Sequence, residues 1–315
     1  MRYFYSGNAG FLKGIAGRLA QAGFERTDDV GAAEAVVTYC TSQTALEDAY
    51  FAEAGFVQAA RSGTLLVDLS PSTPNFAREL NAVALVSDLA FVEAPVVVED
   101  VVAADAFARR ENLVCFAAGE DGDVARAKPL LEALAADVRE TGVSGSAQLA
   151  RAAYTLQTAA QVVSAIEADA LFAATLHAQT GSGLAGLRAQ GACPRAQGVL
   201  DAIAAEGFSG AYTCEMFMAE LSAALMAADD ADLILPQAES ALHLVELLAV
   251  IGGSDMAPAA LALVYGDEAT CARHGLDWTR AEQTYADGEG FEEEDDDCGC
   301  GHGHGDYRGF DYSSN

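Results

Sequence analysis

Gly142-Val-Ser-Gly-Ser-Ala-Gln-Leu-Ala-Arg-Ala-Ala-Tyr-Thr-Leu-Gln157 is the stretch that decides the fold of this chain. Its glycines and serines at 142–145 are typical of a loop, and Ser146 is a candidate N-cap. From Ala147 no Gly or Pro occurs until Gly181, so we expect one long helix rich in Ala, Leu and Gln. A long helix entered through such a loop predicts a domain junction, with a ligand cleft beside it.

Before this junction, strand and helix patterns alternate. The β-prone runs are Arg2–Tyr5, Ala35–Tyr39, Thr64–Leu69, Leu89–Val92 and Leu113–Ala117. Helical patterns lie between them, up to Ala22 and at 44–60, 75–81, 103–110 and 123–134. This alternation predicts an α/β fold, a Rossmann-like doubly wound parallel sheet over residues 1–142.

After the junction the pattern is helical throughout. Further helices are expected at Cys214–Asp229, Pro236–Ile251 and Ala257–Tyr265. The sequence therefore predicts an all-α domain over residues 143–285, followed by a separate tail at 286–315.

The first strand is followed by a turn that contains Gly7 and Gly10, as in a nucleotide-binding unit. When the G-x-G-x-x-G fingerprint is laid over residues 5–10, its first glycine is replaced by Tyr5, while Gly7 would let the backbone approach a phosphate. An ordinary strand-to-helix turn is the alternative. The next segment, 24–29, is too short and polar for a full second strand and helix. Glu25 or Arg26 either contacts a ribose or, as we favour, lies on the surface.

Charge and cysteine content bound the partners. The 315 residues carry a formal charge of −30, which disfavours binding to nucleic acid or to an anionic membrane. We find no run of 18 uncharged apolar residues and no signal-peptide pattern, so we expect a cytoplasmic protein without a membrane segment. Five cysteines lie singly in apolar surroundings, as reduced thiols do: Cys40, Cys115, Cys193, Cys214 and Cys271.

The tail combines acids with a short metal-binding pattern. Residues 292–297 are all acidic, which predicts disorder. Four thiol and imidazole groups then alternate with glycine: Cys298, Cys300, His302 and His304. Such groups are preferred ligands of zinc, nickel and copper, so we expect affinity for a transition metal. The alternative is a tail that only confers solubility.

Several landmarks together resemble the β-hydroxyacid dehydrogenase family, which includes 3-hydroxyisobutyrate dehydrogenase. They run in the family's order over about residues 1–270: Tyr5–Gly10, Val67–Thr73, Phe91–Val96, Gly142–Thr155, Leu233–Pro236 and Gly252–Met256. The resemblance implies an NAD(P)-binding domain of the 6-phosphogluconate dehydrogenase type, an all-α domain, and a homodimer formed through its helices.

The resemblance also implies which residues contact NAD or NADP. They lie in the first turn and after the next two strands: Ser6, Gly7, Asn8, Ala9, Gly10, Cys40, Thr41 and Ser70.

The catalytic positions of the family have changed. The family uses a lysine on the long helix to take the hydroxyl proton, and an asparagine four residues later; the resemblance places Arg151 and Thr155 there. Arginine stays protonated and cannot act as a general base, but it can bind a carboxylate. The family's Ser-Gly-Gly, which holds the substrate carboxylate, is replaced by residues 97–99, and a further lysine by Ala219 or Glu220. No lysine follows Lys128, and the other cations expected near the cleft are Arg188 and Arg195.

Two hypotheses follow. In the first, the chain is a divergent NAD(P)-dependent oxidoreductase of a small carboxylate, with Arg151 as the substrate anchor and with the family reaction lost or altered. In the second, it is a non-catalytic dimeric ligand-binding or scaffold protein with a metal-binding tail. Nucleotide binding is the property that separates them.

Overall fold

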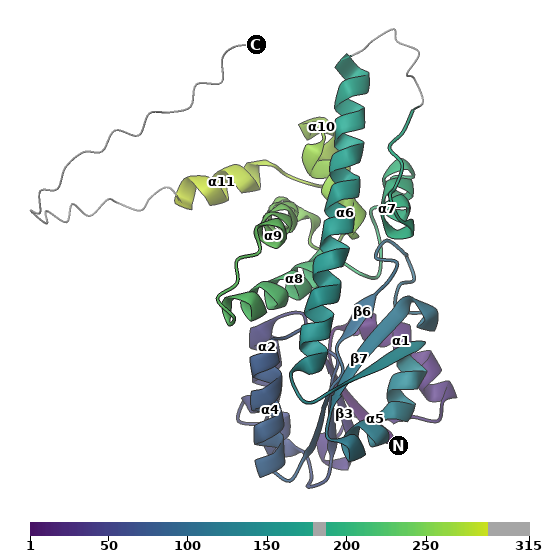
Figure 1. Cartoon of the computed structure of the whole chain (residues 1–315), viewed down its shortest axis with the longest axis vertical. Coiled ribbons are helices and arrows are strands. Elements are labelled where there is room, and N and C mark those ends of the chain that lie inside the picture. Colours follow the sequence, from purple (N-terminus) through teal and green to yellow (C-terminus); the bar gives the residue numbers. More distant parts are fainter. Residues whose placement is uncertain (179–186, 289–315) are drawn as a thin grey trace, which may run out of the picture.

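The computed structural model describes residues 1–178 and 187–288. A sheet flanked by helices forms one end of the elongated molecule, a group of helices forms the other, and helix α6 (Ser146–Ala178) runs along both (Figure 1). The expected α/β fold with a helical C-terminal part is confirmed. One hydrophobic core continues from the sheet into the helices, with Ile15 and Phe217 among its members. The predicted domain limits at 142 and 285 stay a prediction.

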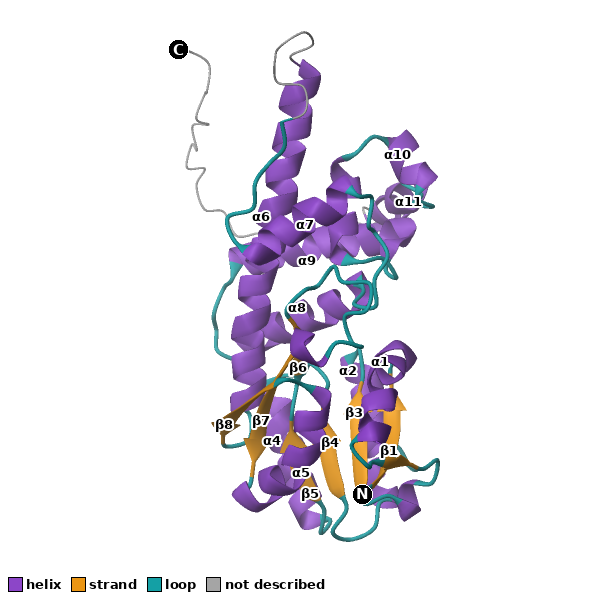
Figure 2. Cartoon of the chain, turned by 90° about the vertical axis from the view of Figure 1, so that its right-hand side faces the viewer, coloured by secondary structure: helices purple, strands orange, loops and turns teal. Residues whose placement is uncertain are grey.

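The sheet has the strand order β2-β1-β3-β4-β5-β7-β6, with β8 paired to β7. Figure 2 shows β1, β3, β4 and β5 in its lower part. Its strands are β1 Arg2–Gly7, β2 Glu25–Arg26, β3 Ala35–Tyr39, β4 Leu65–Asp68, β5 Ala90–Glu93, β6 Val96–Val98, β7 Leu113–Gly119 and β8 Asp137–Gly142.

The sheet is parallel from β2 through β1, β3 and β4 to β5, as expected, and is mixed beyond β5. Strand β7 runs antiparallel to both β5 and β6. The helix expected at 103–110 is absent; turns and a 3-10 segment, η2 (Arg110–Asn112), connect β6 to β7 instead. Without a crossover helix the chain turns back beside its own strand, and the pairing is antiparallel.

Helices cover both faces of the sheet. The apolar side chains of α1 and α5 pack on one face, and those of α2, α3 and α4 on the other (Figure 1). These helices are α1 Ala9–Gln21, α2 Gln43–Phe51, α3 Phe56–Ala59, α4 Pro74–Val86 and α5 Asp121–Leu134. This is the doubly wound arrangement that alternation of strands and helices predicts.

The helical part is built around α6. Its other members are α7 Pro194–Ala204, α8 Cys214–Asp229, α9 Pro236–Leu248, η3 Ala249–Gly253, η4 Pro258–Tyr265, α10 Glu268–Arg273 and α11 Thr279–Gly288. By length and composition alone, Ser146–Leu176 would suit a membrane span. In this fold its Val162 and Ile166 are fully buried in the shared core. The expectation that no segment crosses a membrane stays a prediction.

The start of α6 is anchored differently from what the sequence predicts. Ser146 is the first helical residue rather than the N-cap. The amides of Gly145 and Ala147 donate instead to Oε1 of Glu93, at the end of β5, at 3.3 Å in the case of Ala147. A carboxylate at a helix N-terminus is stabilised by the amides and the helix dipole. Glu93 thus joins the start of the long helix to the carboxyl end of β5.

Candidate functional site

Gly7 ends β1 in a turn that only glycine can form. Its φ is +121°, and a Cβ there would lie 2.0 Å from the carbonyl oxygen of Tyr39 on β3. Gly7 is therefore required by the turn between β1 and α1. The overlay of the fingerprint on residues 5–10, with Tyr5 at its first position, stays a prediction. Asn8 caps α1, since its Oδ1 accepts from the amide of Phe11 at 3.0 Å.

The turn presents an open helix N-terminus. Gly7, Ala9 and Gly10 are exposed, while Ser6 and Asn8 are half-buried. Within the described chain, the amides of Ala9 and Gly10 donate to no protein atom. Free amides and the positive end of a helix dipole suit a phosphate group, so these residues fit the pyrophosphate of a dinucleotide.

The other three predicted cofactor residues lie at the carboxyl ends of β3 and β4. The amide of Cys40 donates to Oγ of Ser70 at 2.9 Å, and both side chains are buried. Burial, with Asp68 nearby, raises the pKa of the Cys40 thiol to about 12. Thr41 donates its hydroxyl to Glu215 on α8 at 2.9 Å. The structure brings Cys40 and Ser70 together, while the Thr41 side chain is bonded to α8. The contact of these residues with a cofactor stays a prediction.

Arg151 on α6 is fully buried and bonded on three sides. Its Nε donates to Gln148 Oε1 at 3.0 Å, and its Nη1 to the carbonyl oxygen of Glu220 at 2.9 Å. Its Nη2 donates to the carbonyl oxygen of Ser72 at 3.2 Å. Gln148 also binds the loop after β4, accepting from the amide of Ser72 and donating to the carbonyl of Ser70. Arg151 thus joins α6, α8 and the β4 loop.

Glu220 is the acidic partner of this cluster. Thr155, the second predicted catalytic residue, donates its hydroxyl to Glu220 Oε2 at 2.9 Å. Burial raises the pKa of Glu220, and the charge of Arg151 opposes that rise. Burial lowers the pKa of Arg151 to about 10, so it remains protonated at neutral pH. The structure therefore buries a cation and a carboxyl group in one cluster, with the guanidinium bonded to the backbone carbonyl of Glu220. The family roles expected for Arg151 and Thr155 stay a prediction.

Two tyrosines in this cluster have no counterpart in the sequence analysis. Burial, and then the charge of Glu220, raise the pKa of Tyr39 and of Tyr212 well above the usual value. Neither residue lies in a recognisable motif, so no signal pointed to them. Gln148 was also missed, although its position three residues before Arg151 places both on one helix face.

Two buried acidic residues are neighbours on adjacent strands. Asp68 of β4 is in register with Glu93 of β5. Burial raises the pKa of each to about 7. Bonds from Ser70 oppose the rise at Asp68, as the amides of α6 do at Glu93, where the nearby Asp68 adds to it. Both groups change charge near neutral pH.

The raised pKa of Glu93 predicts a pH-dependent stability. Its folded-state pKa lies above its unfolded value of 4.5, so the folded state binds more protons between about pH 4.5 and 7. The stability that proton binding at Glu93 contributes is therefore complete below the unfolded pKa and is lost as pH rises through 7. Glu93→Gln keeps the acceptor oxygen but does not titrate. When the pH is raised from 5 to 8, the free energy of unfolding of wild type should therefore fall by on the order of 2 kcal/mol relative to that of Glu93→Gln. Urea unfolding at both pH values measures this.

The matched control is Glu53→Gln, which removes an equal charge from an exposed side chain. It should shift both free energies of unfolding alike, by less than about 0.5 kcal/mol. Equal pH profiles for Glu93→Gln and Glu53→Gln would contradict the assignment.

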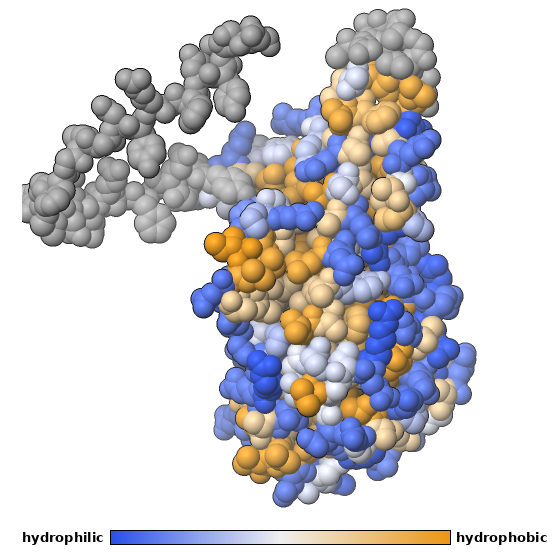
Figure 3. All heavy atoms as spheres, in the orientation of Figure 1, coloured by the Kyte–Doolittle hydropathy of each residue, from blue (hydrophilic) through white to orange (hydrophobic). Residues whose placement is uncertain are grey.

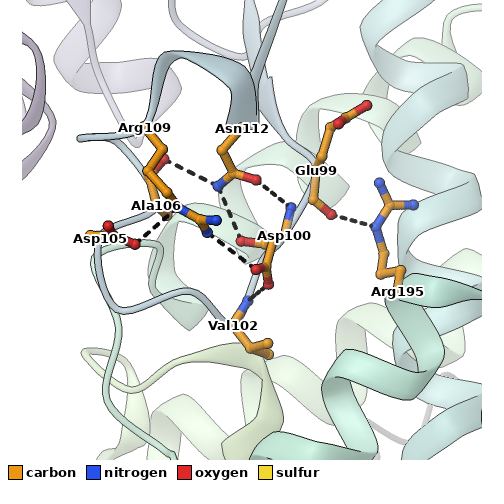
Figure 4. A network of polar contacts seen from close by, with 8 residues as sticks. All are labelled: Glu99, Asp100, Val102, Asp105, Ala106, Arg109, Asn112 and Arg195. Carbon is orange, nitrogen blue, oxygen red and sulfur yellow. Dashed lines mark hydrogen bonds and ion pairs between the residues drawn. The ribbon is translucent and has the colours of Figure 1, made fainter.

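A separate cavity of about 600 Å³ lies between the β6–β7 loop, α6 and α7. Figure 4 shows Asn112 and Arg109 holding Asp100 on one side of it, with Arg195 and Glu99 on the other. All three kinds of nitrogen in Arg195 are engaged: Nε with the carbonyl of Glu99, the others with Gln161 and the hydroxyl of Tyr154. Arg195 shares no partner with Arg151, so the two cations are not brought together.

The predicted metal ligands Cys298, Cys300, His302 and His304 lie outside the described residues. Among residues 1–178 and 187–288, no three potential ligands gather as a metal site would require. The tail's metal affinity stays a prediction.

Comparisons with known proteins identify similar sequences and a shared fold. A family model described as the NAD binding domain of 6-phosphogluconate dehydrogenase matches residues 12–142. An NAD-dependent L-serine dehydrogenase of Pseudomonas aeruginosa is 25% identical over 247 residues, which cover 75% of this chain and 80% of that protein.

Two solved structures share the fold across both parts. A 3-hydroxyisobutyrate dehydrogenase from Salmonella typhimurium superposes with a TM-score of 0.66 at 16% identity. One from Mycobacterium tuberculosis, with L-serine, gives 0.64 at 19% identity. Each alignment covers 84% of this chain and 99% of the other.

Proposed function

The chain belongs to the β-hydroxyacid dehydrogenase family, and from this premise we propose that it is an NAD(P)-binding member that has lost the family's oxidation of a small hydroxy acid. One observation carries the proposal. Arg151, at the position of the proton-accepting lysine, has no exposed surface and is held by three acceptors of the protein.

The chemistry explains why this observation matters. Oxidation of a hydroxyl group needs a base for its proton while hydride leaves; bound NAD(P)+ would supply the hydride acceptor. Arg151, with a pKa of about 10, holds its proton at neutral pH and cannot be that base. Nor is its guanidinium open to a substrate carboxylate, since its donors already bind Gln148, Glu220 and Ser72. Glu220 is itself buried and bonded to Thr155.

Nucleotide binding rests on a different part of the molecule. The turn at Gly7–Gly10 is exposed, and its free amides suit a pyrophosphate. Thr41 is half-buried at the same edge of the sheet. The related protein from Pseudomonas aeruginosa is NAD-dependent, which supports the same cofactor class here.

A non-catalytic homodimer of this fold would need an exposed apolar surface for its interface. Exposed apolar side chains occur along α6 and in the loop after α8, where Leu149 is 62%, Leu171 67% and Ile234 76% exposed. Figure 3 shows apolar residues gathered on the upper part of α6. These residues support a homodimer. The five cysteines of the described chain are free thiols, which supports a reducing compartment such as the cytoplasm.

The test is an assay of nicotinamide reduction with L-serine and with 3-hydroxyisobutyrate, at saturating NAD+ and NADP+. The purified Pseudomonas aeruginosa enzyme, with L-serine and NAD+, serves as the positive control. We expect no turnover above the uncatalysed rate, because no accessible base meets the substrate. Turnover that scales with the amount of wild-type protein and is lost in Arg151→Met would contradict the proposal.

A further inference from the structure

We propose that this chain binds NADH and NADPH with nearly equal affinity, because the strand that reads the ribose 2′-position ends too early to reach it. The inference rests on the nucleotide binding proposed above. In a dinucleotide fold, a residue at the end of the second strand binds the 2′-hydroxyl of NAD or the 2′-phosphate of NADP. The relevant observation is therefore where β2 ends relative to the phosphate-binding turn.

Strand β2 ends well before the level of that turn, measured along the neighbouring strand β1. It consists of two residues, and its register pairs Glu25 with Arg2 and Arg26 with Tyr3. One more bond follows, from the amide of Thr27 to the carbonyl of Tyr3 at 2.8 Å. Strand β1 continues to Gly7, four residues beyond Tyr3. At about 3.3 Å per residue, β2 ends roughly 13 Å short of the turn.

The connection to β3 does not make up the distance. Residues 27–34 contain only the 3-10 turn η1 (Val30–Ala32), and the amide of Glu34 donates back to the carbonyl of Arg2 at 2.9 Å. A parallel crossover usually needs a dozen or more residues with a helix. The connection thus begins beside Tyr3 and ends beside Arg2, at the amino end of β1 and not at the turn.

The charged side chains of the segment are exposed at this lower level of the sheet. Arg26 is exposed and contacts Asp28 at 3.4 Å, so the cation suited to a 2′-phosphate has a carboxylate beside it. Glu25 is exposed at the level of Arg2. By their backbone register, neither Glu25 nor Arg26 lies at the level of the turn. Affinity must then come from contacts that both cofactors share.

The first experiment is a titration followed by nicotinamide fluorescence, at about 0.15 M ionic strength. The ligands are NADH, NADPH and reduced nicotinamide mononucleotide, which lacks the adenosine half. We expect Kd values for NADH and NADPH within about threefold, less than the tenfold that 1.4 kcal/mol represents. A tenfold preference for either dinucleotide would overturn the inference alone. Absence of binding by all three would overturn the proposed function as well.

Variants test where the nucleotide sits. Ala9→Glu places a carboxylate at the open end of α1 and should weaken all three ligands at least tenfold. Gln21→Glu makes the same charge change at the other, exposed end of α1 and should change no Kd more than twofold. Arg26→Ala should leave the ratio of the two dinucleotides unchanged. If Arg26→Ala weakens NADPH tenfold more than NADH, the side chain does read the 2′-position and the inference fails.

Discussion

Replacing Arg151 by alanine should lower the free energy of unfolding by about 3–5 kcal/mol, because it removes the positive charge that offsets the burial of the Glu220 carboxyl group. The loss includes three hydrogen bonds, to Gln148 and to the carbonyls of Glu220 and Ser72. Those bonds join α6 to α8 and to the loop after β4. Urea unfolding followed by circular dichroism measures the effect.

Two comparisons separate this role from that of a substrate anchor. Arg139→Ala removes an arginine that is half-exposed and paired to Asp137, and should cost less than about 1 kcal/mol. The double substitution Arg151→Met with Glu220→Leu removes both charges and should recover most of the stability. If Arg151→Ala unfolds at the wild-type urea concentration, the guanidinium does not stabilise the fold. The hypothesis that Arg151 binds a substrate carboxylate would then be favoured.

Gly7→Ala should destabilise the protein by more than about 4 kcal/mol, the range of exceptional single substitutions. The new Cβ would lie 2.0 Å from the carbonyl oxygen of Tyr39, and the φ of +121° is one that alanine avoids. Because that oxygen belongs to the backbone of a buried central strand, it cannot move aside. The expected readout is a large drop in thermal midpoint together with loss of NADH binding.

Gly17→Ala is the matched control, since Gly17 lies inside α1 with nothing within 4 Å of the added Cβ. It should stabilise the protein by about 0.5–1 kcal/mol, because alanine loses less backbone entropy in a helix. A Gly7→Ala protein as stable as Gly17→Ala would show that the turn differs from the one described.

Sequence patterns were reliable where the cause is local. The absence of Gly and Pro after Ser146 predicted the long helix, which is described as far as Ala178. Helix α8 has the predicted limits, Cys214–Asp229, because Thr213 caps it with its own side chain. The predicted helix at 103–110 failed because the apolar residues there, Ala106 and Phe107, are buried in a loop. Their hydrophobic pattern reflects contact with distant elements and not a helical period.

The candidate site was likewise predictable from the sequence only in part. Arg151 can be recognised in the sequence as the replacement for a lysine, and its chemistry as a permanent cation follows from its type alone. What it does depends on groups 69 and 79 residues away, Glu220 and Ser72, which no local pattern relates to it.

By itself, the sequence determined the α/β fold with its helical C-terminal part, the short second strand and the missing lysine, since each depends on neighbouring residues or on side-chain type. Only the tertiary structure decided that the sheet is mixed, that Gly7 is the turn glycine and that Arg151 is enclosed. Those outcomes depend on which distant backbone and side-chain groups come within contact distance. Burial then decides the chemistry, because removing a group from water changes both its pKa and its access to a ligand.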